Sequence, residues 1–186
     1  TVGDIESMPF LEAVRQMHRE EAEDDIALIH VTLVTIDSQC DQKTKPTQHS
    51  VRDLRELGLT PDAIVARCKE QLHESTKEKI SLFCDVPEKA VISAHDANDI
   101  YEVPLQMEKE GLTDYLMEKL NLDAKGEDSS WNDMVSRMQN MTGKVKLAIV
   151  GKYTHLEDSY ISIRESIKHA AIECGCNVDT IWLNSE

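Results

Sequence analysis

The chain has 186 residues, of which 40% are hydrophobic and 30% are charged, the composition of a globular protein with room for one core or for parts of two. A formal net charge of −15 argues against binding to nucleic acid, which requires a basic surface. The sequence holds neither an apolar run of about 20 residues nor a basic and apolar leader, so we expect no membrane partner and no secretion signal.

The cysteines and the two ends of the chain bear on where it comes from. Five cysteines at irregular spacing predict reduced thiols in a cytoplasmic protein rather than a disulfide framework. Cys174 and Cys176 are too close together for a usual zinc half-site, so no metal site is predicted. The chain begins at Thr1 without a methionine and stops abruptly at Glu186, so we expect a fragment of a longer protein.

The first half of the chain predicts strands that alternate with helices. The run from Ile26 to Val34 is nearly all apolar and β-branched, which is typical of a strand covered on both faces of a parallel sheet. In chain order we expect a helix from Pro9 into the acidic patch 20–25, a strand over 26–34, a polar loop to Ser50, a helix over 51–57 closed by Gly58, a strand over 63–67, a helix capped by Ser75 or Thr76, and a strand over 90–93.

This order predicts an α/β fold with right-handed crossovers between parallel strands. Ligands in such sheets bind beyond the carboxyl ends of the strands, where Arg67 and the pair His95-Asp96 fall.

The second half of the chain predicts a change of domain. A helical stretch over 100–122 should be interrupted by Pro104 and Gly111, and the polar segment 123–130 is the best linker candidate. A helix over 131–141, a strand over 145–151, a helix through Ile161 to Ala170 and a strand over 178–183 would then form a new βαβ unit.

The segment Lys43-Thr44-Lys45-Pro46-Thr47-Gln48 is the best candidate for binding an anion. In an extended loop Lys43 and Lys45 would point to the same side, and Pro46 favours that extended geometry at Lys45. A helix that begins at Thr47 or Ser50 would add its free amide groups. The alternative is a solvated surface loop, and the segment is not a Walker P-loop.

Three further candidates are weaker because each also has a purely structural explanation. Asp4-Ile5-Glu6 precedes the first helix and could serve as a helix cap. Lys79 could be an ordinary solvated lysine, and His95-Asp96 could cap the next helix. No cysteine stands in the context of a nucleophile, so no catalytic residue is assigned.

Three stretches decide among these alternatives by resemblance. They are Thr1 to Ser7 with Pro9-Phe10, Lys43 to Ser50, and Val150-Gly151-Lys152-Tyr153 with Asp158-Ser159-Tyr160. Their order and spacing resemble those of the CTP synthase family over the whole chain. One departure is the approach Ser38-Gln39-Cys40-Asp41-Gln42, where the family usually has Gly-Glu before the lysine segment.

The resemblance implies an enzyme that aminates UTP to CTP with ATP, Mg²⁺ and ammonia from glutamine, and that CTP inhibits. The site residues that it implies are Lys43, Thr44, Lys45, Pro46, Thr47, Gln48 and Lys79 for the polyphosphate of UTP or CTP, Asp4, Ile5 and Glu6 for the inhibitor CTP, and His95, Asp96 and Ala97 for ATP.

The resemblance also implies the domain plan and the partners. Residues 1–122 would be the incomplete parallel sheet of a P-loop-type amidoligase domain, 123–143 a linker, and 144–186 the start of a flavodoxin-like glutaminase domain. The P-loop, the Mg²⁺ ligands and the glutaminase triad would lie outside this sequence, so the chain alone would be inactive. The family implies a homotetramer and in some members filaments, so the alternative function is a non-catalytic module for assembly and regulation.

Overall fold

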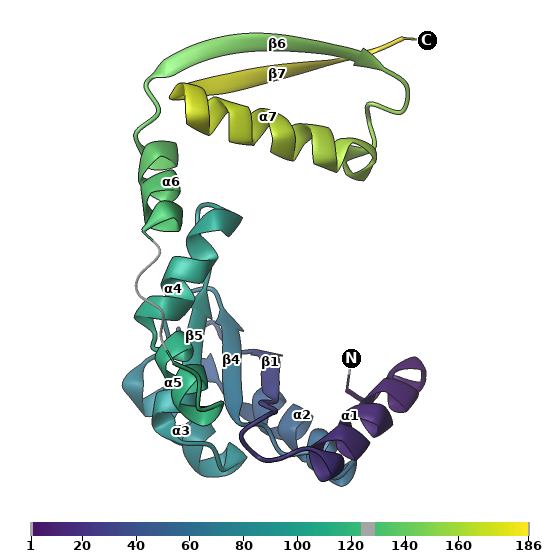
Figure 1. Cartoon of the computed structure of the whole chain (residues 1–186), viewed down its shortest axis with the longest axis vertical. Coiled ribbons are helices and arrows are strands. Elements are labelled where there is room, and N and C mark those ends of the chain that lie inside the picture. The colour runs from purple at the N-terminus through teal and green to yellow at the C-terminus, as the bar shows by residue number, and fades with distance from the viewer. Residues whose placement is uncertain (1, 124–128, 186) are drawn as a thin grey trace. The chain divides into compact units, whose positions relative to one another are not determined.

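The computed structural model describes residues 2–123 and 129–185. These residues form two compact units, Thr1–Lys125 and Gly126–Glu186, which are described separately. Both units are α/β structures in which the main strand pairings are parallel, as Figure 1 shows for each. The predicted fold class is therefore confirmed at this level.

A three-stranded parallel sheet in the order β1-β4-β5 forms the centre of the N-terminal unit. Its strands are β1 (Ile29–Leu33), β4 (Ala63–Cys68) and β5 (Val91–His95). The helices of this unit are α1 (Met8–Glu20), α2 (Lys45–Glu56), α3 (Glu74–Cys84), α4 (Val103–Lys109) and α5 (Leu112–Lys119), with 3₁₀ turns η1 (Ile5–Ser7), η2 (Glu88–Ala90) and η3 (Ile100–Glu102).

The two faces of this sheet hold two separate apolar clusters. On the face of α2 and α3, alternate β4 residues such as Ile64 pack with Val51 and Ile80, all almost completely buried. On the other face, Val65 and the β5 residues Ile92 and Ala94 pack with partly buried side chains of α4 and α5. The alternation follows from the two-residue period of a strand and fixes β4 between two layers.

Strand β1 differs from the prediction of a strand covered on both faces. Its α2 face is covered, because His30 Nε2 lies 2.9 Å from Ser50 Oγ on α2. On the opposite face Ile29, Val31 and Leu33 are exposed by 37%, 64% and 57%. The prediction was wrong because, among the described elements, α2 packs on one face of β1 and the other face carries no comparable helix contact.

The loop predicted to run up to Ser50 contains a hairpin and the start of a helix. Strands β2 (Thr35–Ile36) and β3 (Gln42–Lys43) pair antiparallel. The Asp37 carboxylate accepts hydrogen bonds from two backbone N–H groups in the turn, at 2.9 Å each. Helix α2 then begins at Lys45, two residues before the earlier predicted start at Thr47.

Three smaller predictions have mixed outcomes. Gly58, with φ of +78°, follows the end of α2, and Gly111, with φ of +86°, separates α4 from α5, both as predicted. Helix α3 begins after His73, so neither Ser75 nor Thr76 is its N-cap. Pro104 lies in the first turn of α4, where its missing N–H is tolerated, rather than interrupting a helix.

The C-terminal unit contains the predicted βαβ arrangement. Strands β6 (Gly143–Gly151) and β7 (Cys176–Asn184) pair in parallel along their whole length, and α7 (Ile161–Cys174) connects them after the 3₁₀ turn η4 (Glu157–Tyr160). Helix α6 (Ser130–Gln139) precedes β6. Residues 124–128 of the predicted linker lie outside the described residues. No described helix is long and apolar enough to cross a bilayer.

A largely buried ion pair connects several elements of the N-terminal unit. Glu110, which follows α4, accepts a hydrogen bond from Lys77 Nζ on α3 at 2.9 Å, and the side chains are only 9% and 16% exposed. The same carboxylate accepts from Ser93 N–H of β5 at 3.0 Å. Burial alone would raise the pKa of Glu110, but the hydrogen bonds from Lys77 and Ser93 hold this pKa below its usual value.

We expect Glu110→Gln to lower the free energy of unfolding by about 2 kcal/mol at pH 7. The substitution leaves the Lys77 ammonium with a neutral hydrogen-bond partner and no counter-ion in a largely buried site. A carboxylate with a lowered pKa stabilises the fold fully above the pKa of the unfolded chain, about 4.3, and loses this contribution as the pH falls through the folded pKa. The difference between wild type and variant should therefore shrink below about pH 5.

Urea unfolding from pH 7 down to pH 3 measures this difference. Glu118→Gln is the control, because it breaks the exposed pair of Glu118 with Lys89 and should change stability by less than about 0.5 kcal/mol. An equal effect of the two substitutions, or a pH-independent effect of the first, would contradict the assignment.

Candidate functional site

Two lysine-bearing segments that lie far apart in the sequence meet at one pocket in the N-terminal unit. The pocket has a volume of about 250 Å³. Lys43 lies on β3, Lys45 in the first turn of α2, and Lys79 on α3, and all three line it. The described residues that line it are Asp41, Gln42, Lys43, Thr44, Lys45, His73, Ser75, Thr76 and Lys79. We refer to it as the lysine pocket.

The lysine pocket also lies at the N-terminal ends of two helices. The N-cap residues are Thr44 for α2 and His73 for α3, and both line the pocket. Neither side chain makes a capping hydrogen bond. The first amide groups of a helix have no partner within the helix and carry the positive end of its dipole. The backbone therefore adds to the positive potential of the three lysines.

The geometry of the lysine segment differs from the extended loop expected from sequence. Thr44 has helical φ and ψ of −91° and −8°, and Lys45 is already helical. The two lysines therefore do not share one side of an extended strand. They meet at the pocket because the chain turns from β3 into α2 between them.

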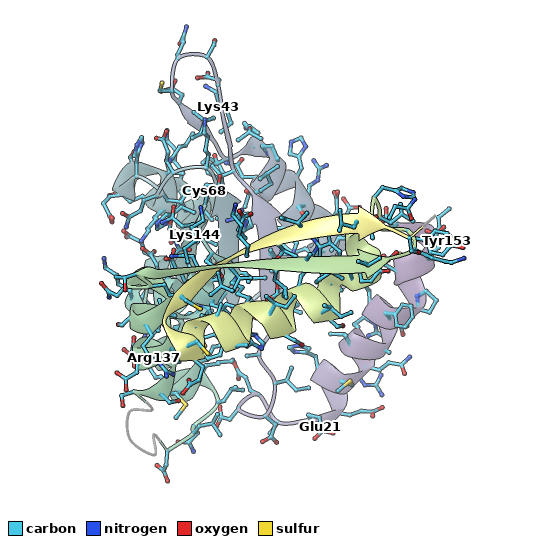
Figure 2. All side chains as sticks on the ribbon, turned by 90° about the horizontal axis from the view of Figure 1, so that it is seen from above. Glu21, Lys43, Cys68, Arg137, Lys144 and Tyr153 are labelled. Atoms are coloured by element: carbon cyan, nitrogen blue, oxygen red, sulfur yellow. The ribbon has the colours of Figure 1, made fainter. Side chains whose placement is uncertain are left out.

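Lys43 has acidic neighbours within the same hairpin. Its Nζ lies 2.7 Å from the Asp37 carboxylate and 3.5 Å from that of Asp41. The hydrogen bond with Asp37 raises the pKa of Lys43, and the same contact lowers the pKa of Asp37. In Figure 2 the hairpin loop projects from the N-terminal unit with Lys43 near its base. An anion that binds here must compete with these carboxylates.

Several residues of the predicted segment point elsewhere. Thr47 is completely buried, and its hydroxyl lies 3.3 Å from that of Thr32 on β1. Gln48 Nε2 donates to Thr44 Oγ1 at 3.0 Å. Thr47, Gln48 and Pro46 are absent from the described lining of the pocket. Sequence reasoning missed His73, Ser75 and Thr76, whose only signal was their position just before Lys79.

A second pocket, of about 560 Å³, lies at the carboxyl ends of β4 and β5. Arg67, Asp96 and Ala97 line it, together with residues of η3 and α4 that the sequence did not single out. Arg67 donates to Asp96 Oδ1 at 2.8 Å and to the Ala94 carbonyl at 2.6 Å. Asp96 is therefore fixed by an ion pair and not by a helix N-terminus.

Two predicted groups lie outside both pockets as far as the described residues define them. The His95 side chain is half-buried, and its Nδ1 has no hydrogen-bond partner among the described atoms. Asp4, Ile5 and Glu6 lie at the start of η1, where Ile5 is 85% exposed. These three residues are absent from the described lining of the lysine pocket.

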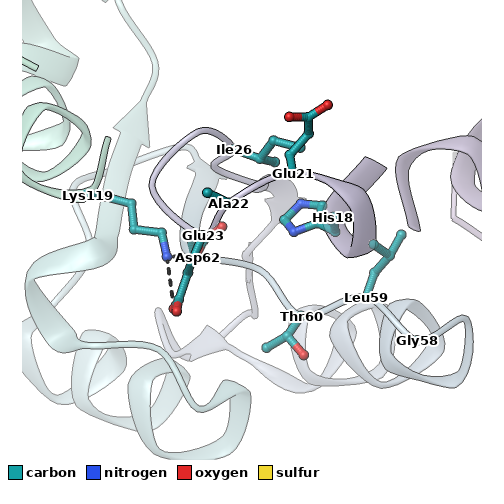
Figure 3. Close-up of a pocket in the computed structure, with 10 residues that line it drawn as sticks. All are labelled: His18, Glu21, Ala22, Glu23, Ile26, Gly58, Leu59, Thr60, Asp62 and Lys119. Carbon is teal, nitrogen blue, oxygen red and sulfur yellow. Dashed lines mark hydrogen bonds and ion pairs between the residues drawn. The ribbon is translucent and has the colours of Figure 1, made fainter. Parts of the chain in front are cut away.

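A third pocket, of about 460 Å³, opens beside the segments that enter β1 and β4, at the N-terminal ends of these strands (Figure 3). Lys119 Nζ lies 3.2 Å from Asp62 there, and Asp62 accepts from the Leu28 N–H at 2.7 Å. These contacts hold the starts of the two strands together. None of the residues predicted to bind nucleotide is among its described lining residues.

The side chains needed to hold a divalent metal do not come together in the part of the chain that the structure describes. Within residues 2–123 and 129–185 no three His, Cys, Asp or Glu side chains form a group that could hold an ion. The Asp96 carboxylate is already paired with Arg67.

Comparison with known proteins identifies the family. The family described as CTP synthase N-terminus matches residues 1–122. Over all 186 residues the chain is 70% identical to a CTP synthase of Methanococcoides burtonii, 61% to one of Archaeoglobus fulgidus and 63% to one of Methanosarcina acetivorans. It spans 35% of the length of each of these relatives. The chain therefore belongs to the CTP synthase family.

Proposed function

We propose that the lysine pocket binds the polyphosphate of UTP or CTP, within an enzyme that converts UTP to CTP with ATP and ammonia from glutamine. The observation that carries this proposal is the convergence of Lys43, Lys45 and Lys79 with two helix N-termini at one pocket. Cations and helix amides together are the groups that bind phosphate in proteins.

The net charge of the whole chain strengthens the case for this local group of cations. With a net charge of −15, the surface repels polyanions on average, so a phosphate chain needs a local group of cations. Hydrogen bonds between charged partners contribute about 1.5–3 kcal/mol each, so three or four of them are enough for a triphosphate at millimolar to micromolar affinity. Residues Thr44 to Gln48 supply the helix start that presents these groups.

We assign ATP to the pocket at the carboxyl ends of β4 and β5, with Asp96 and Ala97 as contacts from its wall. His95, which the resemblance also implies for ATP, directly precedes these two residues but lies outside the described lining, so its contact would need a ligand that extends beyond the pocket. This edge of a parallel sheet is where nucleotides bind in open α/β folds. The Arg67 guanidinium fixes Asp96, and it also adds a positive charge at the pocket wall. The two nucleotides would then occupy separate pockets of one unit.

Asp4, Ile5 and Glu6 would contact the base of CTP when it acts as an inhibitor. Their exposure supports this assignment. Ile5 is 85% exposed and the carboxylates of Asp4 and Glu6 are also at the surface, so a ligand or a neighbouring subunit can reach them. The complete enzyme would act as a homotetramer with Mg²⁺, whose ligands we expect outside the described residues.

The first test is binding of UTP to the 186-residue chain, measured by calorimetry. Lys79→Met removes one of three cations and should weaken binding at least tenfold. Lys69→Met is the matched control, because Lys69 is exposed and does not line the lysine pocket. Equal affinities of the two variants would refute the assignment of the pocket.

The second test separates the two nucleotide pockets by activity. The chain replaces the matching segment of the Methanococcoides burtonii relative, to which it is 70% identical, and CTP formation is measured. In this hybrid Lys79→Met should raise the KM for UTP about tenfold, and Asp96→Asn should do the same for ATP. Asp85→Asn, at a carboxylate that is 91% exposed, is the control.

We expect no CTP formation by the chain alone, since the P-loop and the glutaminase triad of the family are not in its sequence. Turnover by the isolated chain, or an identical KM pattern for the two variants, would contradict the division of roles. If either variant of the hybrid lost its assembly into oligomers but still bound UTP, the non-catalytic role in assembly and regulation would be favoured.

A further inference from the structure

The Gln42 side chain forms two hydrogen bonds that connect the two halves of the lysine pocket. Its Nε2 donates to the Gln71 carbonyl at 2.9 Å, and its Oε1 accepts from the His73 N–H at 2.9 Å. The amide group thus pairs with the backbone of the loop between β4 and α3 in the way a neighbouring strand would. We refer to this pair of bonds as the Gln42 clamp.

The elements that the clamp joins carry the cations of the pocket. Gln42 directly precedes Lys43 on β3. On the other side, His73 is the N-cap of α3, and Lys79 lies one and a half turns into that helix. The two segments are about 30 residues apart in the sequence, so the chain itself does not set the distance between them.

Apart from its chain connections to β1 and α2 and the Asp37 contacts within its own turn, the hairpin has a short ladder. Strand β3 pairs with β2 at only two residue positions, Thr35 with Lys43 and Ile36 with Gln42. The loop on the other side of the clamp is firmly anchored. Leu72 N–H donates to the buried Ser93 hydroxyl at 2.9 Å, and Gln71 Nε2 donates to Glu110 at 3.1 Å. The clamp therefore ties a short hairpin to a loop that is itself bonded to the central sheet and to Glu110.

The clamp also leaves the anion-binding groups of α3 available. The His73 N–H is taken up by Gln42, whereas Thr76 N–H and Lys77 N–H are bonded to the His73 carbonyl. By their place in the first turn, the N–H groups of Glu74 and Ser75 have no acceptor within the helix. Ser75 lines the lysine pocket.

We propose that Gln42 is a positioning residue that sets the spacing of Lys43 from Lys79 and the start of α3 for binding of a polyphosphate. The inference rests on the proposed function of the lysine pocket. Gln42 need not touch the ligand. Its contribution is preorganisation, because a hairpin that moves by about 1 Å no longer places Lys43 and Lys79 on the same phosphate chain.

The test compares Gln42→Met with wild type in the 186-residue chain. Methionine keeps the length of the side chain and removes both hydrogen bonds. Gln39→Met is the matched control, because Gln39 lies in the turn of the same hairpin and its side chain is exposed and outside the clamp. Binding of UTP and of inorganic tripolyphosphate is measured by calorimetry, and the melting temperature is measured for each variant.

We expect Gln42→Met to weaken binding of both ligands about tenfold, with orthophosphate binding nearly unchanged, because one phosphate does not need both lysines. Gln39→Met should bind like wild type. If Gln42→Met does not fold, Gln42→Asn takes its place, since a side chain shorter by one methylene group withdraws the amide from the two backbone partners while keeping its polarity. Wild-type affinity in the folded Gln42 variant would overturn the proposal.

A double-mutant cycle with Lys79→Met distinguishes positioning from a general loss of stability. If Gln42 acts by spacing the two lysines, its substitution should cost clearly less than the original tenfold once Lys79 is absent, because only the start of α3 is left to be positioned against Lys43. Full additivity of the two losses would overturn the positioning role while the pocket assignment stands. Failure of wild type to bind tripolyphosphate at all would instead remove the pocket assignment and this inference together.

Discussion

The Glu110 carboxylate is the contact on which the N-terminal unit depends. It receives hydrogen bonds from Lys77 on α3, from the backbone of β5 at Ser93, and from Gln71 in the loop between β4 and α3. Removal of one partner would leave a charge without its counter-ion at a largely buried point, so this carboxylate couples the placement of these three elements. The same carboxylate therefore fixes the helix that carries Lys79 of the lysine pocket, since Lys77 and Lys79 both lie on α3.

Sequence patterns predicted the strands and helices well wherever the run of apolar residues, or their helical spacing, extends over five or more residues. β4, β5 and the whole βαβ unit at the C-terminal end lie close to their predicted ranges. The hairpin before α2 escaped prediction because β2 and β3 have two residues each, too few for any period, and because Asp37 holds the turn through side-chain contacts. Coverage of β1 could not be predicted either, since a run of apolar residues does not say how many layers pack against it.

For the site, sequence and structure contribute different information. The resemblance singled out Lys43, Lys45 and Lys79, but no spacing rule places residues 43 and 79 at one pocket. That follows only from the parallel order β1-β4-β5, which brings the starts of α2 and α3 to the same edge. The inward turn of Thr47 was equally hidden, because its polarity suggested the surface while its place on α2 faces β1. The assignment of ligands to these residues stays a prediction.

The two oxygens of Asp37 have separate tasks. Oδ1 accepts both N–H groups of the hairpin turn, and Oδ2 is the counter-ion of Lys43. A competing anion that draws the lysine away therefore takes nothing from the turn, whose hydrogen bonds remain complete. The counter-ion of Lys43 can therefore be exchanged for a bound anion while the hydrogen bonds that hold the hairpin turn stay in place.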